Sequence, residues 1–323
     1  MPPMTQAELL RKAAGTQATT DFPSTGLLLP EQSTAFLDLV YDATPFSKLM
    51  RTERRRSKSG TIAKIGIGGR LLRKKSQGVD DAILSKPVYS DIAYQTAASR
   101  LDWEINEEVF QENIEQEGYE DHVARLMGDQ VGRDLEDLHF NGDTADTSSD
   151  AAFLDQNDGW LKQLAAGSSG AHRVNGATIN GGYIEKGHFF AAHAALPSKY
   201  WQDGKIKWIM NPTLWGVYIE YLTNRATPAG DAALVGTLSS FGTPLNIGAV
   251  FVPSLPATRL LLGDPNNFIA VNTYDIRRRR TTEGREAIRQ DKRFYAIFLD
   301  DDPIIETTDA VVDVYGLIAG IHP

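Results

Sequence analysis

The spacing of hydrophobic residues changes along this chain of 323 residues. Between Gly60 and Ile67 isoleucines alternate with small and polar residues, and a second extended stretch runs from Pro87 to Leu101. Alternation of this kind is typical of strands. A Lys-, Gly- and Asp-rich segment between Arg70 and Lys86 joins the two stretches. The pattern predicts a long two-stranded hairpin, which is only marginally stable alone and needs a surface to lie on.

After the hairpin, the hydrophobic period lengthens to that of an amphipathic helix. Asn106 is placed to cap this helix, and Glu107 and Glu108 suit the dipole of its first turn. An Asn-Gly-Asp turn at 141–143 ends it. If the helix is continuous from Asn106 to His139, it has about 34 residues and is roughly 50 Å long. Its hydrophobic stripe consists of Phe110, Ile114, Tyr119, Val123, Met127, Val131, Leu135 and Leu138.

The other segments predict an extended N-terminus and a mixed α/β region, so the expected class is α+β. Residues 1–30 are polar and rich in Thr, Pro and Gly, which is typical of an arm without a core. A short amphipathic helix is expected to open at Pro30. We expect Asp300–Pro303 to be a charged turn between the last two strands. Further helices are expected at 185–201 and 212–223, and strands at 206–210, 243–253, 259–263, 268–271, 294–299 and 311–318.

Charge is segregated along the chain. Residues 51–75 contain ten Lys and Arg and one acid, whereas residues 102–121 contain nine Asp and Glu and no base. Because blocks of one sign repel themselves, a basic hairpin and an acidic helix suggest contact between complementary surfaces. If the acidic surface belongs to another copy, the chain is built to assemble. The candidate contact residues are Arg54, Arg55, Arg56, Lys58, Lys64, Arg70, Arg73, Lys74 and Lys75 on the basic side and Glu107, Glu108, Glu112 and Glu115 on the acidic side.

Composition excludes several classes of protein. A formal net charge of −9 and a pI near 5.2 argue against a dedicated nucleic-acid binder. The absence of cysteine excludes disulfides and thiolate metal sites and fits a reducing cytosol. No apolar run approaches the roughly 20 residues of a membrane helix, and the first fifteen residues lack the apolar core of a secretory signal. We therefore expect a soluble protein that is made in the cytoplasm and has no membrane partner.

No residue pattern supports an enzyme. His188 and His193 are five residues apart, which is the wrong spacing for two metal ligands on one helix face. The sequence contains neither a phosphate-binding loop with its lysine nor a GxSxG motif. Asp143, Asp146 and Asp150 could gather a calcium ion, but their spacing is not that of an EF-hand, and a solvated loop is preferred. We expect no catalytic residue, no cofactor and no metal.

A second basic cluster consists of Arg277, Arg278, Arg279 and Arg280. The preferred interpretation is a solvated strand end or a contact between subunits. The alternative is non-specific contact with the phosphates of double-stranded DNA, which would be sensitive to salt. The two interpretations differ in the face of the molecule that the arginines occupy.

Four longer segments follow one another in a recognisable order. SRLDWEINEEVFQEN at 99–113 leads from the hairpin into the long helix, and LHFNGDTADTSSDAAFLDQNDGWLKQL at 138–164 contains the Asn-Gly-Asp turn. GTPLNIGAVFVPSLPATRLLLGDPNNFIA at 242–270 and the later IRQDKRFYAIFLDDDPIIETTDAVVDVYG contain the remaining strands. This order resembles the major capsid proteins of tailed bacteriophages, which have the Hong Kong 97 fold. The resemblance extends from about residue 30 to the C-terminus and lies in the joint order of the segments.

The resemblance implies a fold with an N-terminal arm (1–35), an extended hairpin loop (57–97), a peripheral domain with a long spine helix (36–56, 98–165 and 271–323) and an axial domain (166–270). It also implies assembly through hexamers and pentamers into an icosahedral shell around double-stranded DNA. Assembly would take place in the host bacterial cytoplasm, and the final location would be the virion capsid. Implied partners besides the chain itself are scaffold, portal and decoration proteins.

Two other interpretations stay open. An encapsulin-type nanocompartment has the same fold but encloses protein cargo, and the long basic hairpin and the extended arm favour the phage shell over it. A soluble metal-dependent α/β enzyme that uses the aspartate-rich loops is the alternative of a different class. Some shells of the family are locked by a Lys–Asn isopeptide bond. Since the late strands contain no recognisable pair of Asn and Glu for such a bond, we expect a shell without covalent links.

Overall fold

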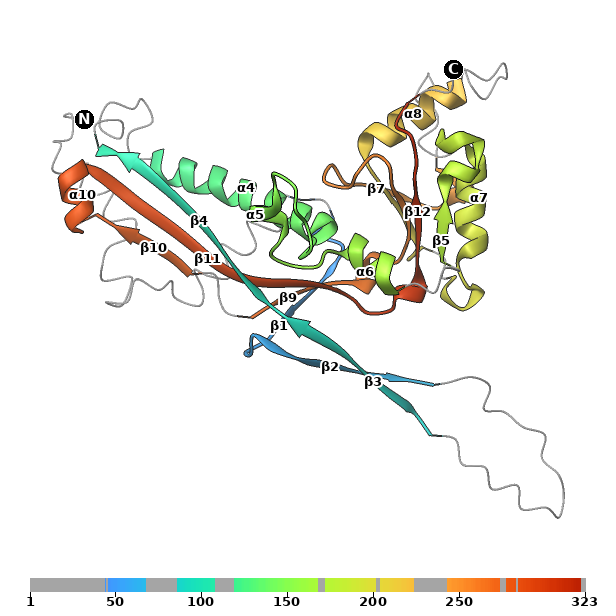
Figure 1. The fold of residues 1–323 in the computed structure, drawn as a ribbon, viewed down its shortest axis with the longest axis horizontal. Coiled ribbons are helices and arrows are strands. Elements are labelled where there is room, and N and C mark those ends of the chain that lie inside the picture. Colours follow the sequence, from blue (N-terminus) through green and yellow to red (C-terminus); the bar gives the residue numbers. More distant parts are fainter. Residues whose placement is uncertain are drawn as a thin grey trace, which may run out of the picture.

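The computed structural model describes residues 44, 46–67, 86–107, 119–167, 172–201, 204–223, 243–273, 277–282 and 284–320. Within these ranges the chain forms two five-stranded sheets and one two-stranded sheet. Figure 1 shows the two larger sheets next to each other, with the two-stranded hairpin projecting away from them. The expected N-terminal arm and the short helix at Pro30 lie outside the described residues.

The first sheet is elongated and is built around β11 (Lys292–Ile305). One edge of β11 pairs with β4 (Ala97–Asn106), and the other pairs with β9 (Phe268–Asn272) and β10 (Arg277–Thr281). Strand β1 (Arg51–Arg54) extends the sheet by pairing in parallel with β9. Helix α4 (Tyr119–Asn141) runs along β4 and β11. Val131 and Leu135 of this helix pack against Ile297 and Leu299, so alternate residues of β11 face the helix.

The second sheet has the strand order β5-β12-β8-β6-β7 and is flanked by helices (Figure 1). Phe189 of α7 and Tyr218 of α8 pack around the buried Trp208 of this sheet. The central strands β8 and β6 are apolar runs, as expected of strands covered on both faces. Its elements are β5 (Arg173–Asn175), β6 (Lys207–Met210), β7 (Ala249–Phe251), β8 (Leu260–Gly263), β12 (Val311–Tyr315), α7 (Lys186–Ala195) and α8 (Pro212–Thr223).

The projecting hairpin consists of β2 (Ser59–Gly66) and β3 (Val88–Gln95), which pair antiparallel. At its root, Ile62 and Tyr94 pack with Ile269 and Ile304 of the first sheet. The second extended stretch of the sequence is therefore two strands. Residues before Thr96 pair within the hairpin, and residues after it form β4 of the first sheet.

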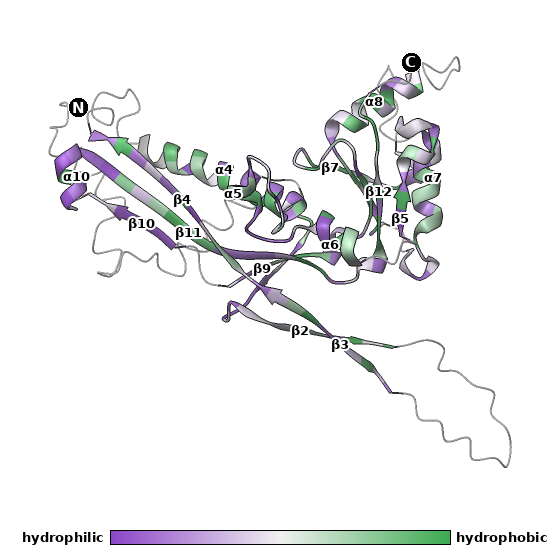
Figure 2. Ribbon diagram, in the orientation of Figure 1, coloured by the Kyte–Doolittle hydropathy of each residue, from purple (hydrophilic) through white to green (hydrophobic). Residues whose placement is uncertain are grey.

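The largest buried cluster joins the two five-stranded sheets. Trp160, the first residue of α6 (Trp160–Gly167), is fully buried, and its ring lies 4.9 Å from that of Phe140 and 5.1 Å from that of Phe268. Residues of both sheets, such as Phe268 and Leu261, belong to this cluster. Figure 2 shows hydrophobic positions along β12 and on α4, and hydrophilic positions along β10. The short helices α5 (Ala151–Leu154) and α10 (Arg285–Gln290) lie outside this core.

Several predicted elements are confirmed. Helix α8 has the expected bounds, and β6, β8, β9 and β12 lie within one residue of the predicted strands or inside them. Helix α4 ends at Asn141, two residues beyond the expected end, whereas residues 108–118 lie outside the described part of the chain. Among the described helices, none has both the length and the apolar composition needed to cross a bilayer.

Three expectations about local structure are wrong. The helix expected at 185–201 ends at Ala195, because Pro197 disfavours helical geometry in the residue before it. The strand expected at 243–253 begins with a 3-10 turn, in which Leu245 has φ 58°, and only β7 remains extended. The segment Asp300–Pro303 is not a charged turn: it lies inside β11, where Asp300 and Asp301 are buried.

Candidate assembly surface and hairpin root

The outer part of the hairpin exposes hydrophobic side chains. Ile65, Ile67, Val88 and Tyr89 are 68%, 69%, 54% and 70% exposed, respectively. A two-stranded ribbon has no interior in which these side chains could be buried. We call these four residues the distal patch. Exposed apolar surface of this kind is typical of a site that contacts another molecule.

The basic residues nearest the hairpin root contact their own chain. Lys58 donates a hydrogen bond to Asp300 (3.0 Å), and Arg55 forms an ion pair with Glu53 (2.6 Å). Lys64 donates to the main-chain carbonyl of Glu306 (2.9 Å) and to the hydroxyl of Thr307. These bonds anchor the hairpin to β11 and the segment after it. Arg54 and Arg56 have exposed side chains, whereas Arg70, Arg73, Lys74 and Lys75 lie outside the described residues.

The described residues of the acidic block also form ion pairs within their own chain. Glu107 forms a bidentate pair with Arg293, with distances of 2.6 and 2.7 Å. Glu104 pairs with Lys292 (2.5 Å) across β4 and β11. Glu108, Glu112 and Glu115 lie outside the described residues. The pairing of basic and acidic residues between subunits therefore stays a prediction.

A buried polar cluster lies where the hairpin root, α4 and β11 meet. We call Asp300, Asp301 and Asp302 with Glu136 and His139 the acidic corner. The ring of His139 bonds the carboxylate of Asp301, and both side chains are almost fully buried. The main-chain N–H of Gln95 donates to Asp302 (2.7 Å). The corner thus joins the spine helix to the base of the projecting hairpin.

Two carboxyl groups of the corner titrate near neutral pH. Burial raises the pKa of Glu136 to about 7, and Thr44 and His139 act against this rise. Burial also raises the pKa of Asp302 to about 7; the hydrogen bond from Gln95 opposes the rise, and the neighbouring Asp301 adds to it. In the second sheet, burial raises the pKa of Asp313 despite ion pairs with Arg259 (2.6 Å) and Arg173 (3.2 Å).

The acidic corner was not predicted from the sequence. Glu136 and His139 are three residues apart and therefore lie on one side of a helix, next to the hydrophobic stripe that includes Leu135 and Leu138. The hydrophobic residues that resume at Ile304, directly after Pro303, were a second signal. They indicate that the strand continues through the aspartates instead of turning at them.

The four consecutive arginines are divided between two faces of the first sheet. Arg277 and Arg279 lie 5.8 and 5.7 Å from the ring of Phe298, on the face away from α4. Arg278 is buried on the other face, with its guanidinium 6.0 Å from the ring of Tyr295. The run is therefore not one continuous basic patch. On the face away from α4, Arg279 is exposed and Arg277 is partly buried. The choice between DNA and inter-subunit contact stays a prediction.

The aspartate-rich loop after α4 binds the side-chain ammonium group of Lys162. Lys162 lies 2.6 Å from Asp143 and 2.7 Å from Asp158, and its hydrogen bonds lower the pKa of Asp143. Asp146 caps its own turn by accepting hydrogen bonds from Ser148. In the part of the chain that the structure describes, no group of three His, Asp or Glu side chains is arranged to hold a metal ion.

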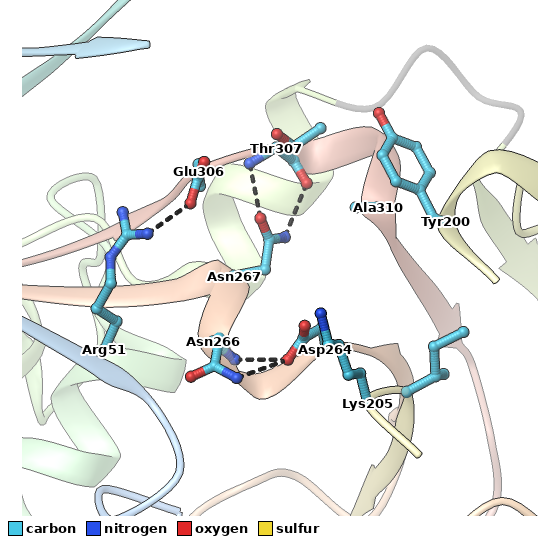
Figure 3. Close-up of a pocket in the computed structure, with 10 residues that line it drawn as sticks. Arg51, Tyr200, Lys205, Asp264, Asn266, Asn267, Glu306, Thr307 and Ala310 are labelled. Atoms are coloured by element: carbon cyan, nitrogen blue, oxygen red, sulfur yellow. Dashed lines mark hydrogen bonds and ion pairs between the residues drawn. The ribbon is translucent and has the colours of Figure 1, made fainter. Parts of the chain in front are cut away.

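A pocket of about 220 Å³ lies between the start of β1, the turn before β9 and the segment after β11. Most of its polar side chains form hydrogen bonds or ion pairs with neighbouring lining residues (Figure 3). Arg51 pairs with Glu306 (2.8 Å), and the side chain of Asn267 exchanges two hydrogen bonds with the main chain of Thr307. Asp264 accepts hydrogen bonds from Asn266. These bonds therefore stabilise the junction between β9 and the end of β11, and the polar side chains around the pocket are occupied by them.

Comparisons with known proteins agree with this architecture. No family model matches the chain. The sequence is 28% identical, over 96% of this chain and 98% of the relative, to the "Putative prophage capsid protein YqbE" of Bacillus subtilis (strain 168). The fold matches a chain of the structure "Satellite phage P4 procapsid including size determination (Sid) protein" with a TM-score of 0.69, at 16% identity over 98% of this chain and 99% of that one.

A shell of another kind also matches. The SrpI encapsulin of Synechococcus elongatus PCC 7942 gives a TM-score of 0.56, at 12% identity over 87% of this chain and 91% of that one. At these identities the structural matches describe the fold, and the sequence relative adds a resemblance along nearly the whole chain. The chain therefore has the Hong Kong 97-type capsid fold and resembles the major capsid proteins of tailed bacteriophages.

Proposed function

We propose that this chain is the major capsid protein of a tailed bacteriophage or prophage and that it assembles with copies of itself into an icosahedral shell. The observation that carries the proposal is the distal patch on a projecting hairpin, in a fold shared with shell subunits. An isolated molecule leaves Ile65 and Tyr89 in water, whereas a neighbouring copy can cover them. The resemblance to a prophage capsid protein over 96% of the chain supports the same function.

The finer form of the proposal follows the domain division of the family. Residues 1–35 form the arm, 57–97 the extended hairpin loop and 166–270 the axial domain, and the remaining segments form the peripheral domain. Hexamers and pentamers of the chain enclose double-stranded DNA, with scaffold, portal and decoration proteins as further partners. Assembly takes place in the host cytoplasm and produces the virion capsid.

Hydrophobic contact is expected to contribute more to assembly than each ion pair does. Burial of an Ile side chain contributes roughly 1.5–3 kcal/mol, whereas an exposed ion pair contributes about 0–1 kcal/mol. Each subunit offers one hairpin and receives another, so these contacts repeat around every capsomer. Repetition makes individually weak contacts effective because later contacts form within an assembly that already exists.

An encapsulin-type compartment is the second candidate, because an encapsulin shares the fold at a TM-score of 0.56. Both candidates predict closed shells, so they differ in content. A phage shell encloses DNA, whereas an encapsulin compartment encloses protein cargo.

Negative-stain electron microscopy of the purified full-length chain tests the proposal. Closed shells or ring-shaped capsomers of uniform size are expected, and small particles of single-chain mass would contradict it. The second measurement distinguishes the two candidates. Particles isolated from lysates of the native host are treated with nuclease and then opened, and protected DNA of uniform length supports the phage shell. A stoichiometric co-purifying protein with no DNA supports the compartment instead.

A further inference from the structure

The orientation of the hairpin depends on a small number of contacts at its root. The apolar part of this contact consists of Ile62 and Tyr94 against Ile269, Val271 and Ile304. A ribbon of two strands cannot fix its own direction. The polar bonds to the acidic corner, together with those of Lys64 to Glu306 and Thr307, are therefore a substantial part of what holds the hairpin at its observed angle.

Two of these bonds end on aspartates of β11 that lie two positions apart. Lys58, just before β2, donates to Asp300 (3.0 Å), and the N–H of Gln95, the last residue of β3, donates to Asp302 (2.7 Å). The hydroxyl of Thr273 donates to Thr96 (2.7 Å) and closes the root from the side of β9. Lys58, just before β2, and Gln95, the last residue of β3, are thus tied to alternate positions of one strand.

The corner concentrates negative charge in a confined space. Asp300 and Asp301 are 4% and 1% exposed, and Asp302 is half-buried beside them. The groups that face Asp302 with charge are Asp301, Asp158 and His139, whereas Lys58 reaches Asp300. On α4, Glu136 faces His139. Ionisation of Asp302 adds a charge to a site where most neighbouring groups are already acidic.

We propose that the acidic corner is a pH-sensitive clamp, which holds the hairpin root against β11 while Asp302 is protonated and releases it when Asp302 ionises. An opened root returns the Asp302 carboxyl to water, where an ionised carboxylate is well solvated. The closed root keeps this carboxyl half-buried against Asp301. Because the closed form binds the proton more tightly, rising pH favours the open form.

The sign and size of the effect follow from the pKa of Asp302, which burial raises from 3.8 to about 7 in the closed form. The opening equilibrium shifts wherever the open form has lost the proton and the closed form has kept it. If opening restores the ordinary pKa, the population of the open form increases about tenfold between pH 6 and pH 8. Above pH 8 the effect levels off, since both forms are then ionised.

Hydrogen exchange of the unassembled full-length chain tests this inference at the Gln95 amide, which donates to Asp302. After correction for intrinsic exchange, we expect the protection factor of this amide to fall about tenfold from pH 6 to pH 8. Amides of β6, in the other sheet, keep their protection. Asp302→Asn and Asp302→Ser cannot titrate, and each is expected to remove the pH dependence, so the failure of one variant to fold leaves the other.

Two further variants serve as controls. Asp91→Asn, on the exposed face of β3, is expected to behave as the wild type. Lys58→Gln removes the bond to Asp300 and is expected to accelerate exchange at both pH values while keeping the pH dependence. Wild-type protection that is equal at pH 6 and pH 8 would overturn the inference, as would a tenfold fall that persists without Asp302. The inference rests on the fold and not on the proposed function, because the free chain is measured.

Discussion

Replacement of Glu136 by Gln is expected to stabilise the chain, and to do so more strongly as the pH rises from 5 to 8. Glu136 lies on α4 with 3% of its surface exposed, and His139 is one turn further along the helix. Gln has nearly the same shape as a protonated Glu and cannot ionise. The substitution therefore removes the cost of a buried carboxylate charge without opening a cavity.

The magnitude follows from the pKa of Glu136, which burial raises from 4.5 to about 7. An acid with a raised pKa in the folded state imposes no penalty below its unfolded value, and the full penalty appears above its folded value. A rise of roughly 2.5 units corresponds to about 3 kcal/mol. We expect Glu136→Gln to raise the free energy of unfolding by about 1 kcal/mol at pH 5 and about 3 kcal/mol at pH 8.

Urea denaturation of the unassembled chain at several pH values measures this difference, and tryptophan fluorescence reports unfolding because Trp160 and Trp208 are fully buried in the folded chain. Asp129→Asn on the partly exposed surface of the same helix is the matched control and should change the free energy of unfolding by less than about 0.5 kcal/mol. A difference between Glu136→Gln and wild type that does not change with pH would refute the reasoning. A destabilised variant at pH 8 would refute it as well.

Four further outcomes are expected. Ile65→Ser with Tyr89→Ser should abolish shells in electron microscopy while the free energy of unfolding changes by less than about 1 kcal/mol, since both side chains are exposed; normal shells would contradict the role of the distal patch. Glu108→Lys with Glu112→Lys should impair assembly of a folded subunit, and unchanged yields of shells would remove the electrostatic docking hypothesis. Trp160→Ala should destabilise the chain by roughly 3–5 kcal/mol in urea denaturation; a loss below 1 kcal/mol would show that the joint core is not essential. Denaturing electrophoresis of particles should give a single band near 35.5 kDa, and ladders of higher mass would reveal covalent links.

The sequence predicted those parts of the fold in which local pattern and tertiary environment agree. The apolar run of β6 and the amphipathic pattern of α8 give elements with nearly the expected bounds, because each is buried in the way its pattern requires. The hairpin was also predictable, since its glycines and alternating isoleucines leave it few other structures. The sequence did not predict that the extended stretch is divided into β3 and β4 at Thr96. The two strands have similar local patterns and differ in their pairing partners, which are β2 for β3 and β11 for β4.

The acidic corner escaped prediction for a physical reason. A run of three aspartates ordinarily belongs to a solvated turn, because an isolated carboxylate is costly to bury. Here His139 pairs with Asp301 across 162 positions of sequence, and Lys58 pairs with Asp300 across 242. Contacts at such separations are set by the packing of the whole fold. Arg278 follows the same rule: the alternation of a strand places it against Tyr295, whereas the sequence shows only four adjacent positive charges.

The internal partners of these charges also limit what electrostatics can contribute to assembly. Glu107 already has both carboxylate oxygens on Arg293, and Lys58 and Lys64 already hold the hairpin to its own subunit. A neighbouring copy that paired with these groups would have to break existing bonds, so the net gain would be small. Ile65 and Tyr89 are exposed to water, so their burial against a neighbouring copy breaks no contact within the subunit. Burying them is therefore expected to contribute a net favourable free energy. In the proposed shell, we therefore expect the segregated charges to influence where a hairpin docks and in which orientation, and we expect the hydrophobic distal patch to supply most of the free energy of this contact.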